Sequence, residues 1–222
     1  MPFADRAAAG RLLADRLAAF GLRDPVVLAL PRGGVPVGYE VARRLSAELA
    51  AEVPFDVLVT RKIGYPYQPE LGVGAIAEGG AAVLDESLLD RLQLTKEDVA
   101  ATVQRETAEM DRRIAVYRGE RSPPAVTDKQ VIVVDDGLAT GGTARAALRA
   151  VRSKDPERVI LAVPVGAAET VAALRREADD VVVLAEPQRF RAVGQWYRHF
   201  EQLSDDDVLQ WLGRDPGHSA EG

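Results

Sequence analysis

Clusters of β-branched and other apolar residues alternate along this chain with longer segments of helical spacing. The strand-like clusters lie at residues 26–30, 55–60, 131–135, 158–165 and 180–187. Such alternation is typical of parallel strands joined by helices that cover both faces of one sheet. The sequence therefore predicts an α/β fold, doubly wound, with a mainly parallel sheet flanked by helices.

The segments between these clusters carry further local signals. Residues 1–17, 35–50 and 87–117 have the charge and apolar spacing of helices, and a further helix is expected to open at Thr143. Residues 63–72 (IGYPYQPELG) are rich in proline, glycine and tyrosine, which predicts a mobile loop. Residues 74–86 are expected to form a short hairpin that turns at Gly79 and Gly80.

The composition argues against several classes of function. A net charge of −6 disfavours nucleic acid as the main partner, because phosphate-backbone affinity needs clustered Lys and Arg. The lack of cysteine removes disulfides, thiolate metal sites and a Cys nucleophile, and makes the cytoplasm the expected location. No apolar run approaches the roughly twenty residues that cross a bilayer, so no membrane partner is expected.

The stretch VIVVDDGLATGGT, residues 131–143, joins two acids to a loop of small and hydroxyl residues. A short loop that leaves a strand and opens a helix presents unpaired backbone N–H groups at the positive end of the helix dipole, which suits a phosphate. Asp135 and Asp136 would repel that anion, and they suit hydroxyl groups or a hard cation. A ligand that joins a phosphate to a vicinal diol is a phosphorylated ribose.

Other interpretations of these residues are weaker. A nucleoside-triphosphate P-loop would have Lys where Gly142 stands, and a receiver domain would have a phosphoacceptor Asp at the next strand end, where Pro164 stands. A dinucleotide-binding turn at Gly72, Gly74 and Ala77 would need a strand before it and a helix after it. An ordinary strand-to-helix connection is the plain alternative, since Asp and Gly are common turn residues, and the length of the string argues against it.

Residues 131–143 strongly resemble the motif with which type I phosphoribosyltransferases bind 5-phosphoribosyl diphosphate (PRPP). PRGG (residues 31–34) resembles that family's diphosphate loop, and RKIG (residues 61–64) resembles the basic element that begins its mobile catalytic loop. The RKIG and GAIAEGG segments also resemble a subgroup of uncharacterised predicted phosphoribosyltransferases. The resemblance implies one domain over residues 1–222, with a core at about 26–184 and a small hood formed by the chain ends, about 1–25 and 185–215.

The same resemblance implies transfer of the phosphoribosyl group to a nucleophilic nitrogen, with loss of diphosphate and inversion at the anomeric carbon. Magnesium is the implied cofactor, held at Asp135 and Asp136 directly or through PRPP and water. Arg32 and Lys62 are expected to serve the leaving diphosphate, and Glu78 is a candidate acid or base. The implied PRPP-binding residues are Arg32, Gly33, Gly34, Arg61, Lys62, Asp135, Asp136, Ala139, Thr140, Gly141, Gly142 and Thr143.

The expected acceptor is a planar nitrogen heterocycle such as a nucleobase. The family's 6-oxopurine enzymes carry an Asp where this chain has Ala139, which favours adenine-like or pyrimidine-like acceptors. Phe190, Trp196 and Tyr197 are the candidate acceptor-binding residues, because a flat base gains from stacking on aromatic rings; ordinary core packing is the alternative. A noncatalytic PRPP-binding regulator is the alternative function, and the acceptor's identity and a homo-oligomeric state are left open.

Overall fold

The computed structural model describes residues 3–213 and contains a five-stranded sheet with the order β2-β1-β6-β7-β8. Every neighbouring pair of strands in it is parallel. The predicted α/β, doubly wound architecture is confirmed. The strands are β1 (Pro25–Ala29), β2 (Phe55–Val57), β6 (Gln130–Val134), β7 (Arg158–Val165) and β8 (Asp180–Ala185).

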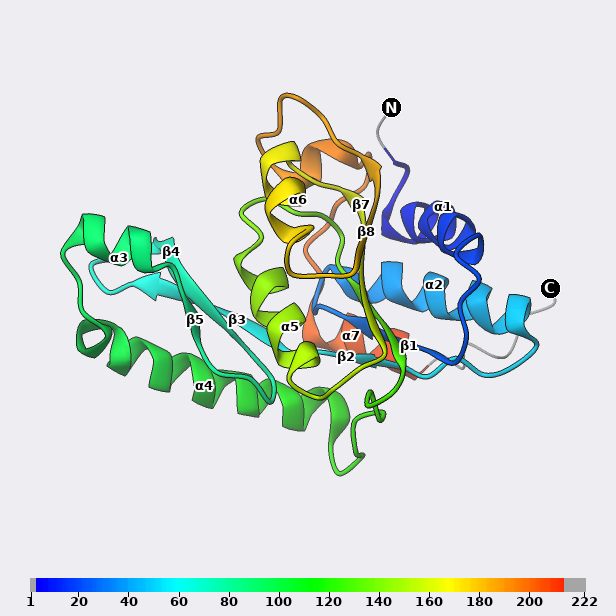
Figure 1. Ribbon diagram of the computed structural model, residues 1–222, viewed down its shortest axis with the longest axis horizontal. Helices are drawn as coiled ribbons and strands as arrows, with labels where there is room; N and C mark the ends of the chain where they lie inside the picture. The colour runs from blue at the N-terminus through cyan, green and yellow to red at the C-terminus, as the bar shows by residue number, and fades with distance from the viewer. Residues whose placement is uncertain (1–2, 214–222) are drawn as a thin grey trace.

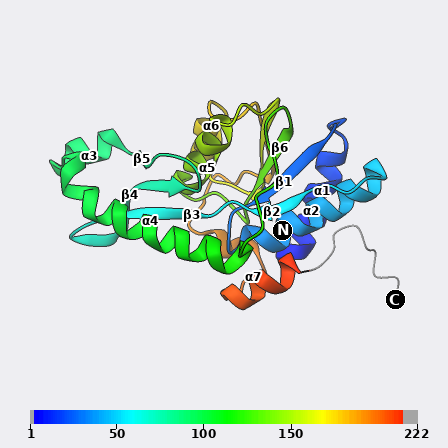
Figure 2. The ribbon, with the colours of Figure 1, turned by 90° about the horizontal axis from the view of Figure 1, so that it is seen from below.

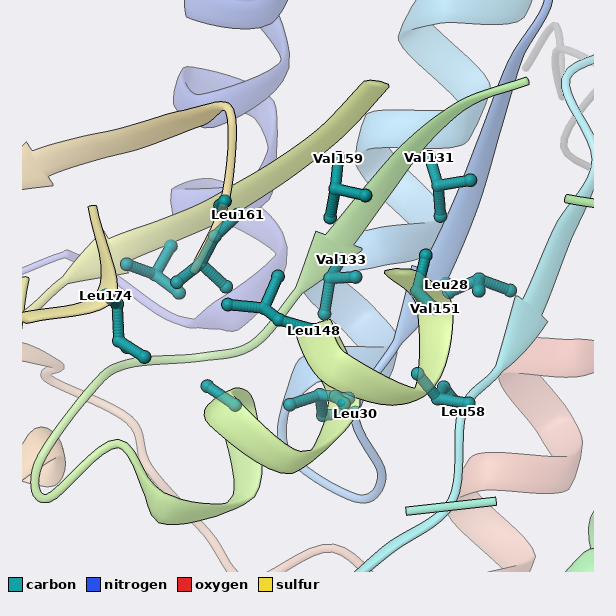
Figure 3. Close-up of a cluster of buried hydrophobic side chains, with 14 of the residues drawn as sticks. Leu28, Leu30, Leu58, Val131, Val133, Leu148, Val151, Val159, Leu161 and Leu174 are labelled. Atoms are coloured by element: carbon teal, nitrogen blue, oxygen red, sulfur yellow. The ribbon is translucent and has the colours of Figure 1, made fainter. Parts of the chain in front are cut away.

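Helices cover both faces of this sheet because each strand sends alternate side chains to opposite sides (Figure 1). On one face Val27, Ile132 and Ile160 pack against the first two helices. On the other face Leu28 and Val133 pack against two later helices, and Figure 3 shows this second cluster. The first pair is α1 (Arg6–Ala18) and α2 (Gly34–Leu49), and the second is α5 (Gly142–Arg152) and α6 (Ala168–Leu174).

A second, antiparallel sheet forms an arm that projects from the central sheet (Figures 1 and 2). Its apolar side packs on two helices through residues such as Ile63, Val73, Leu89 and Met110. The arm consists of β3 (Thr60–Tyr65), β4 (Gln68–Ala77), β5 (Val83–Leu84), α3 (Glu86–Leu92) and α4 (Lys96–Arg118). The predicted hairpin at residues 74–86 is confirmed as the β4–β5 pair.

The prediction of an irregular loop at residues 63–72 is wrong. These residues belong to the β3–β4 hairpin, in which the pairing shifts register on both sides of Gly64. A Cβ atom at Gly64 would lie 2.5 Å from the carbonyl oxygen of Pro69, so glycine is what allows the two strands to approach here. Proline and glycine mark the turn and the irregularity of a hairpin in this case, and pairing between the strands supplies the regular structure.

Two further predicted elements are divided in the structure. The strand predicted at residues 55–60 becomes β2 of the central sheet and the start of β3 in the arm. The helix predicted at residues 87–117 is broken at Gln93, whose φ of 55° lies in the left-handed region, and restarts after a capping box formed by Thr95 and Asp98. Helical spacing continues through this break, so periodicity alone does not reveal it.

The start of the described chain meets the segment of residues 196–199 near the carboxyl edge of the central sheet. Phe3 forms a bridge with Tyr197, which follows the short helix η1 (Val193–Trp196). The last helix, α7 (Asp205–Leu212), packs on α2 and α4. Within residues 3–213, no helix has both the length and the apolar character needed to cross a bilayer.

Candidate functional site

The candidate site lies where the order of the central sheet reverses. From β1 the chain continues outward to β2, whereas from β6 it continues in the opposite direction to β7 and β8. The loops after β1 and β6 therefore leave neighbouring strands and diverge, which opens a crevice at the carboxyl ends of open α/β sheets. Residues 31–34 follow β1, and residues 135–143 follow β6, so the structure brings together two motifs about 100 residues apart in the sequence.

The loop of residues 139–143 has the geometry of an anion cradle. The backbone N–H groups of residues 140–144 donate no hydrogen bond within the described part of the chain. Gly141 has a φ of 73° and is the N-cap residue just before α5, and Thr170 of α6 supports the loop by donating to the carbonyl oxygen of Ala139 at 2.6 Å. A Cβ atom at Gly142 would meet no atom within 4 Å, so this part of the loop borders open space. The loop can therefore receive a phosphate at the positive end of a helix.

The loop of residues 31–34 lies directly against the acid pair. A Cβ atom at Gly33 would lie 2.0 Å from Oδ2 of Asp136, and one at Gly34 would lie 2.7 Å from the carbonyl oxygen of Val134. Only glycine permits this approach. The peptide bond between Pro31 and Arg32 is cis, and the backbone N–H groups of Arg32 and Gly33 have no partner within residues 3–213. A second set of free donors thus borders the carboxylates.

The two carboxylates are held in a poorly solvated setting. Burial raises the pKa of Asp135 well above its usual range, and the neighbouring charge of Asp136 raises it further. Burial also raises the pKa of Asp136, while the guanidinium of Arg6 opposes that shift. Arg6 donates from Nε to Oδ2 of Asp136 at 2.8 Å. A ligand that offers hydroxyl donors or a cation would be favoured here, because it would compensate the buried charge.

Lys62 faces the cradle from the arm. Its side chain and residues Thr140, Gly142 and Thr143 line one cleft of 620 Å³. The Nζ atom of Lys62 donates to the carbonyl oxygen of Glu70 on the neighbouring strand. Arg91 and Arg145 also line the cleft, as do the acids Glu70 and Asp85, so three basic side chains share this cleft with the loop.

Arg61, which was also predicted to bind PRPP, lies on the other face of β3. Its guanidinium donates twice to Oε2 of Glu106 on α4, at 2.9 Å and 2.7 Å. Adjacent residues of a strand point to opposite sides, so Lys62 lines the cleft of 620 Å³ beside the cradle and Arg61 does not, although both border a smaller cleft of 240 Å³ within the arm. The structure therefore gives Arg61 a partner in the arm and leaves Lys62 as the basic residue of β3 that borders the cradle.

Glu78 belongs to a buried charge cluster at the base of the arm. Both of its carboxylate oxygens accept from the guanidinium of Arg118, which also donates to Oδ2 of Asp56 at 2.7 Å and to the carbonyl oxygen of Val57 at 2.8 Å. The Arg118 side chain is only 4% exposed. This cluster joins the end of α4 to β2 and β4. Both carboxylate oxygens of Glu78, the predicted acid or base, are thus occupied by Arg118.

Arg32 points toward the C-terminal helix. Its Nη1 atom lies 3.8 Å from Oδ1 of Asp205, the first residue of α7. The hydroxyl of Tyr117 donates to the same oxygen at 2.5 Å. Burial and this hydrogen bond raise the pKa of Tyr117 to about 12. The side chain of Arg32 is about one quarter exposed, at 28%, and remains accessible beside the free N–H groups of its loop.

Aromatic residues of the chain ends gather beside the acid pair. Phe190, Trp196 and Tyr197 join Phe3 and Phe200 in one apolar cluster. Tyr197 is buried and donates its hydroxyl to the carbonyl oxygen of Asp136 at 2.6 Å. The three predicted acceptor-binding residues thus lie together, outside the C-terminal helix, and Tyr197 directly contacts the acid pair.

The donor chemistry of the acid pair fits magnesium in company with a substrate. Mg²⁺ is usually held by one or two carboxylates together with substrate phosphates and waters. Asp135 and Asp136 supply two carboxylates, and one oxygen of the second is already engaged by Arg6. Within residues 3–213 no group of three or more His, Cys, Asp or Glu side chains is placed to hold a metal ion. The prediction that magnesium is held directly or through PRPP and water is compatible with this set.

Three residues that contact the predicted site residues were not identified from the sequence, Arg6, Arg118 and Asp205, and neither was Tyr117, which contacts Asp205. Each acts on a residue at least 40 positions away. Arg6 looks like one of several charged residues in an amphipathic helix, and Arg118 like the basic end of another. No local pattern distinguishes them from surface charges.

Comparisons with known proteins show which family the chain resembles. The family model for the phosphoribosyl transferase domain matches residues 4–197. A protein of Mycobacterium tuberculosis (strain ATCC 25618 / H37Rv), provisionally named a phosphoribosyl transferase, is 46% identical over 212 residues, which are 96% of this chain and 46% of that protein. The chain thus spans about half the length of the curated relatives of that species.

Two further similarities cover different lengths of the chain. A uracil phosphoribosyltransferase of Alkaliphilus metalliredigens (strain QYMF) is 31% identical over 147 residues, 65% of this chain and 66% of that protein. The crystal structure of a protein from Thermus thermophilus has a TM-score of 0.79 and 42% sequence identity, and the match covers 96% of this chain and 98% of that one. The likeness in fold therefore extends over nearly the whole of both chains.

Proposed function

The chain belongs to the phosphoribosyl transferase domain family, and on that premise we propose that it transfers the phosphoribosyl group of PRPP to a ring nitrogen of a nucleobase-like acceptor, releasing diphosphate. One observation carries the proposal. One loop with five N–H groups and a second loop with two, none of which has a partner within residues 3–213, border a buried acid pair at the point where the sheet order reverses. A phosphate, a diol and a diphosphate joined in one molecule would use all three.

Each part of PRPP has a partner of suitable chemistry in this proposal. The 5-phosphate accepts from the N–H groups of residues 140–144 and from the hydroxyls of Thr140 and Thr143. The ribose hydroxyls donate to Asp135 and Asp136. The diphosphate accepts from the free N–H groups of Arg32 and Gly33 and faces the Arg32 guanidinium.

Catalysis in this proposal is mainly placement and charge stabilisation. Positive charge develops on the sugar ring as the bond to the diphosphate breaks, while negative charge develops on the leaving group. Arg32 and Lys62 would stabilise that leaving group, and magnesium, when bound with PRPP, would supply further positive charge there. The aromatic cluster at the chain ends would exclude water, which otherwise competes with the nitrogen nucleophile for the anomeric carbon.

The acceptor proposed is pyrimidine-like or adenine-like. Ala139 offers no carboxylate to the base, and a relative named uracil phosphoribosyltransferase supports the pyrimidine choice. Phe190 and Trp196 are the aromatic residues proposed to stack on it, while the hydroxyl of Tyr197 is already bound to Asp136. We assign Glu78 to holding the arm through Arg118, because both of its carboxylate oxygens are already engaged.

A nucleobase screen tests the proposal. The protein is incubated with PRPP, magnesium and each of uracil, cytosine, adenine, hypoxanthine and guanine, and both diphosphate and the ribonucleotide product are measured. Formation of a ribonucleotide with one of the first three bases would support the proposal. Asp136→Asn is expected to abolish it. Tight PRPP binding in calorimetry without diphosphate release for any acceptor would instead favour a PRPP-binding regulator.

A further inference from the structure

Arg6 makes an unusual contact with the acid pair, and the family resemblance assigned it no role. It lies in the first turn of α1, 130 residues from Asp136 in the sequence. Its side chain is only 11% exposed, and its Nε atom donates to Oδ2 of Asp136 at 2.8 Å. A buried ion pair between such distant elements constrains both partners, because little water is present to solvate either charged group if the pair separates.

Arg6 is itself fixed from two further directions. Its Nη1 atom donates to the carbonyl oxygen of Glu201 at 2.9 Å, and its guanidinium carbon lies 3.9 Å from the centre of the Phe200 ring. Phe200 in turn stacks on Tyr197, with ring centroids 5.0 Å apart. A guanidinium held in this way has a defined plane, and its planar fork gives a defined direction to each donor.

Asp136 is consequently held at three of its four hydrogen-bonding groups. Its backbone N–H donates to Oδ1 of Asp135 at 2.8 Å, its carbonyl oxygen accepts from the Tyr197 hydroxyl at 2.6 Å, and its Oδ2 accepts from Arg6. Gly33 packs against the same carboxylate. Within residues 3–213, Oδ1 of Asp136 accepts no hydrogen bond, so it is the carboxylate oxygen that a ligand can use.

We infer that Arg6 is a positioning residue for the ribose: it holds the Asp136 carboxylate by Oδ2 and leaves Oδ1 to accept one ribose hydroxyl. This inference rests on the proposed function. The two chain ends act together in it, since backbone hydrogen bonds join Phe3 to Trp196 and to Arg198, and Ala4 to His199, beside the Arg6 contact. Arg6 touches no reacting atom in this role and acts through Asp136.

The test compares ligands that differ by one hydroxyl. Calorimetry measures the affinity of ribose 5-phosphate, 2-deoxyribose 5-phosphate and 3-deoxyribose 5-phosphate for the wild-type protein and its variants. The quantity compared is the affinity ratio, which is the affinity of ribose 5-phosphate divided by that of the deoxy analogue. In the wild type, removal of the hydroxyl that donates to Asp136 should give a ratio of about ten, as expected for a hydrogen bond to a charged acceptor. In Arg6→Gln that ratio should fall toward one for the same analogue, because the carboxylate is no longer held.

Two further variants separate positioning from general damage. Arg11→Gln is the matched control: Arg11 lies on the same helix, is half exposed, and pairs with Glu40 of α2. It should keep the wild-type ratio. Arg6→Lys should give an intermediate ratio, because an ammonium can donate to Oδ2 but lacks the planar fork that also reaches Glu201; it also serves as the test variant if Arg6→Gln does not fold.

The outcomes distinguish the inference from the function on which it rests. If the wild type binds neither ribose 5-phosphate nor PRPP, the proposed function fails and the inference fails with it. If the wild type discriminates between the analogues and both Arg6 variants discriminate equally well, the proposed function stands and Arg6 has no positioning role. Tighter binding of ribose 5-phosphate by Arg6→Gln would also overturn the inference, since it would mean that Arg6 occupies the ligand's place.

Discussion

Removing Arg118 should destabilise the protein strongly, because its guanidinium lies between two carboxylates in a buried setting. The side chains of Arg118, Asp56 and Glu78 are 4%, 6% and 15% exposed. In Arg118→Met, both carboxylates and the carbonyl oxygen of Val57 lose the hydrogen bonds that the guanidinium donates to them. Loss of one partner from a buried ion pair costs about 3–5 kcal/mol. We expect a loss of about 3 kcal/mol here, at the lower end of that range because solvent still reaches Glu78.

Urea denaturation followed by circular dichroism measures this loss as a fall in the free energy of unfolding. The triple variant Asp56→Asn, Glu78→Gln, Arg118→Met removes all three charges and should lose less than the single variant, because no carboxylate is left uncompensated. Arg112→Met is the exposed control, with a half-exposed side chain paired to Glu109, and should change stability by less than about 1 kcal/mol. A cost below about 1 kcal/mol for Arg118→Met, or a triple variant as unstable as the single one, would refute this reasoning.

Other changes test the site and its surroundings. Lys62→Ala should slow diphosphate release more than it weakens ribose 5-phosphate binding, as expected of a contact strongest in the transition state, and equal losses in single-turnover and binding measurements would contradict that role. Gly142→Ala should leave the urea midpoint unchanged or slightly higher, because the new Cβ atom meets no protein atom within 4 Å. The same Cβ atom enters the proposed phosphate cradle, so calorimetry should show weaker PRPP binding. Gly33→Ala should weaken ribose 5-phosphate binding, since its Cβ atom would displace the Asp136 carboxylate 2.0 Å away, and wild-type affinity would show that this carboxylate does not bind the sugar. Burial and a hydrogen bond raise the pKa of Tyr117 to about 12, above the value near 10 of the unfolded chain. Its contribution to stability should therefore be present below about pH 10 and lost as the pH rises to about 12. Free energies of unfolding measured between about pH 9 and 12 should decline less in Tyr117→Phe than in the wild type.

Local patterns were sufficient to predict the central sheet, and together with the family resemblance they pointed to two loops at its carboxyl edge. Buried parallel strands need continuous apolar runs, and a strand that leads into acids and glycines before a helix has few uses in this architecture. Residues 135–143 follow from this pattern, whereas residues 31–34 were assigned through the resemblance of PRGG to a family motif. The structure adds that they leave neighbouring strands, and that glycine at residue 33 allows the first loop to touch Asp136.

The arm shows where local patterns were insufficient. Proline and glycine at residues 63–72 indicated a loop, because a single sequence does not reveal that two such segments pair with each other. The basic pair at residues 61 and 62 likewise appeared to serve one ligand. Once this segment is a strand, alternation sends Lys62 to the cleft and Arg61 to Glu106, so regular structure decides which of two adjacent charges can reach the site.

What the sequence by itself determined is therefore the type of sheet, and it located the two loops for which a ligand is proposed, since both are marked by residues close together in the chain. What only the tertiary structure decided is which distant charges act on those loops. Arg6 contacts Asp136 across 130 residues, and Arg118 contacts Glu78 across 40. A charge on a helix has the same sequence signature whether it faces solvent or a buried carboxylate, because the difference in desolvation arises only when the elements pack.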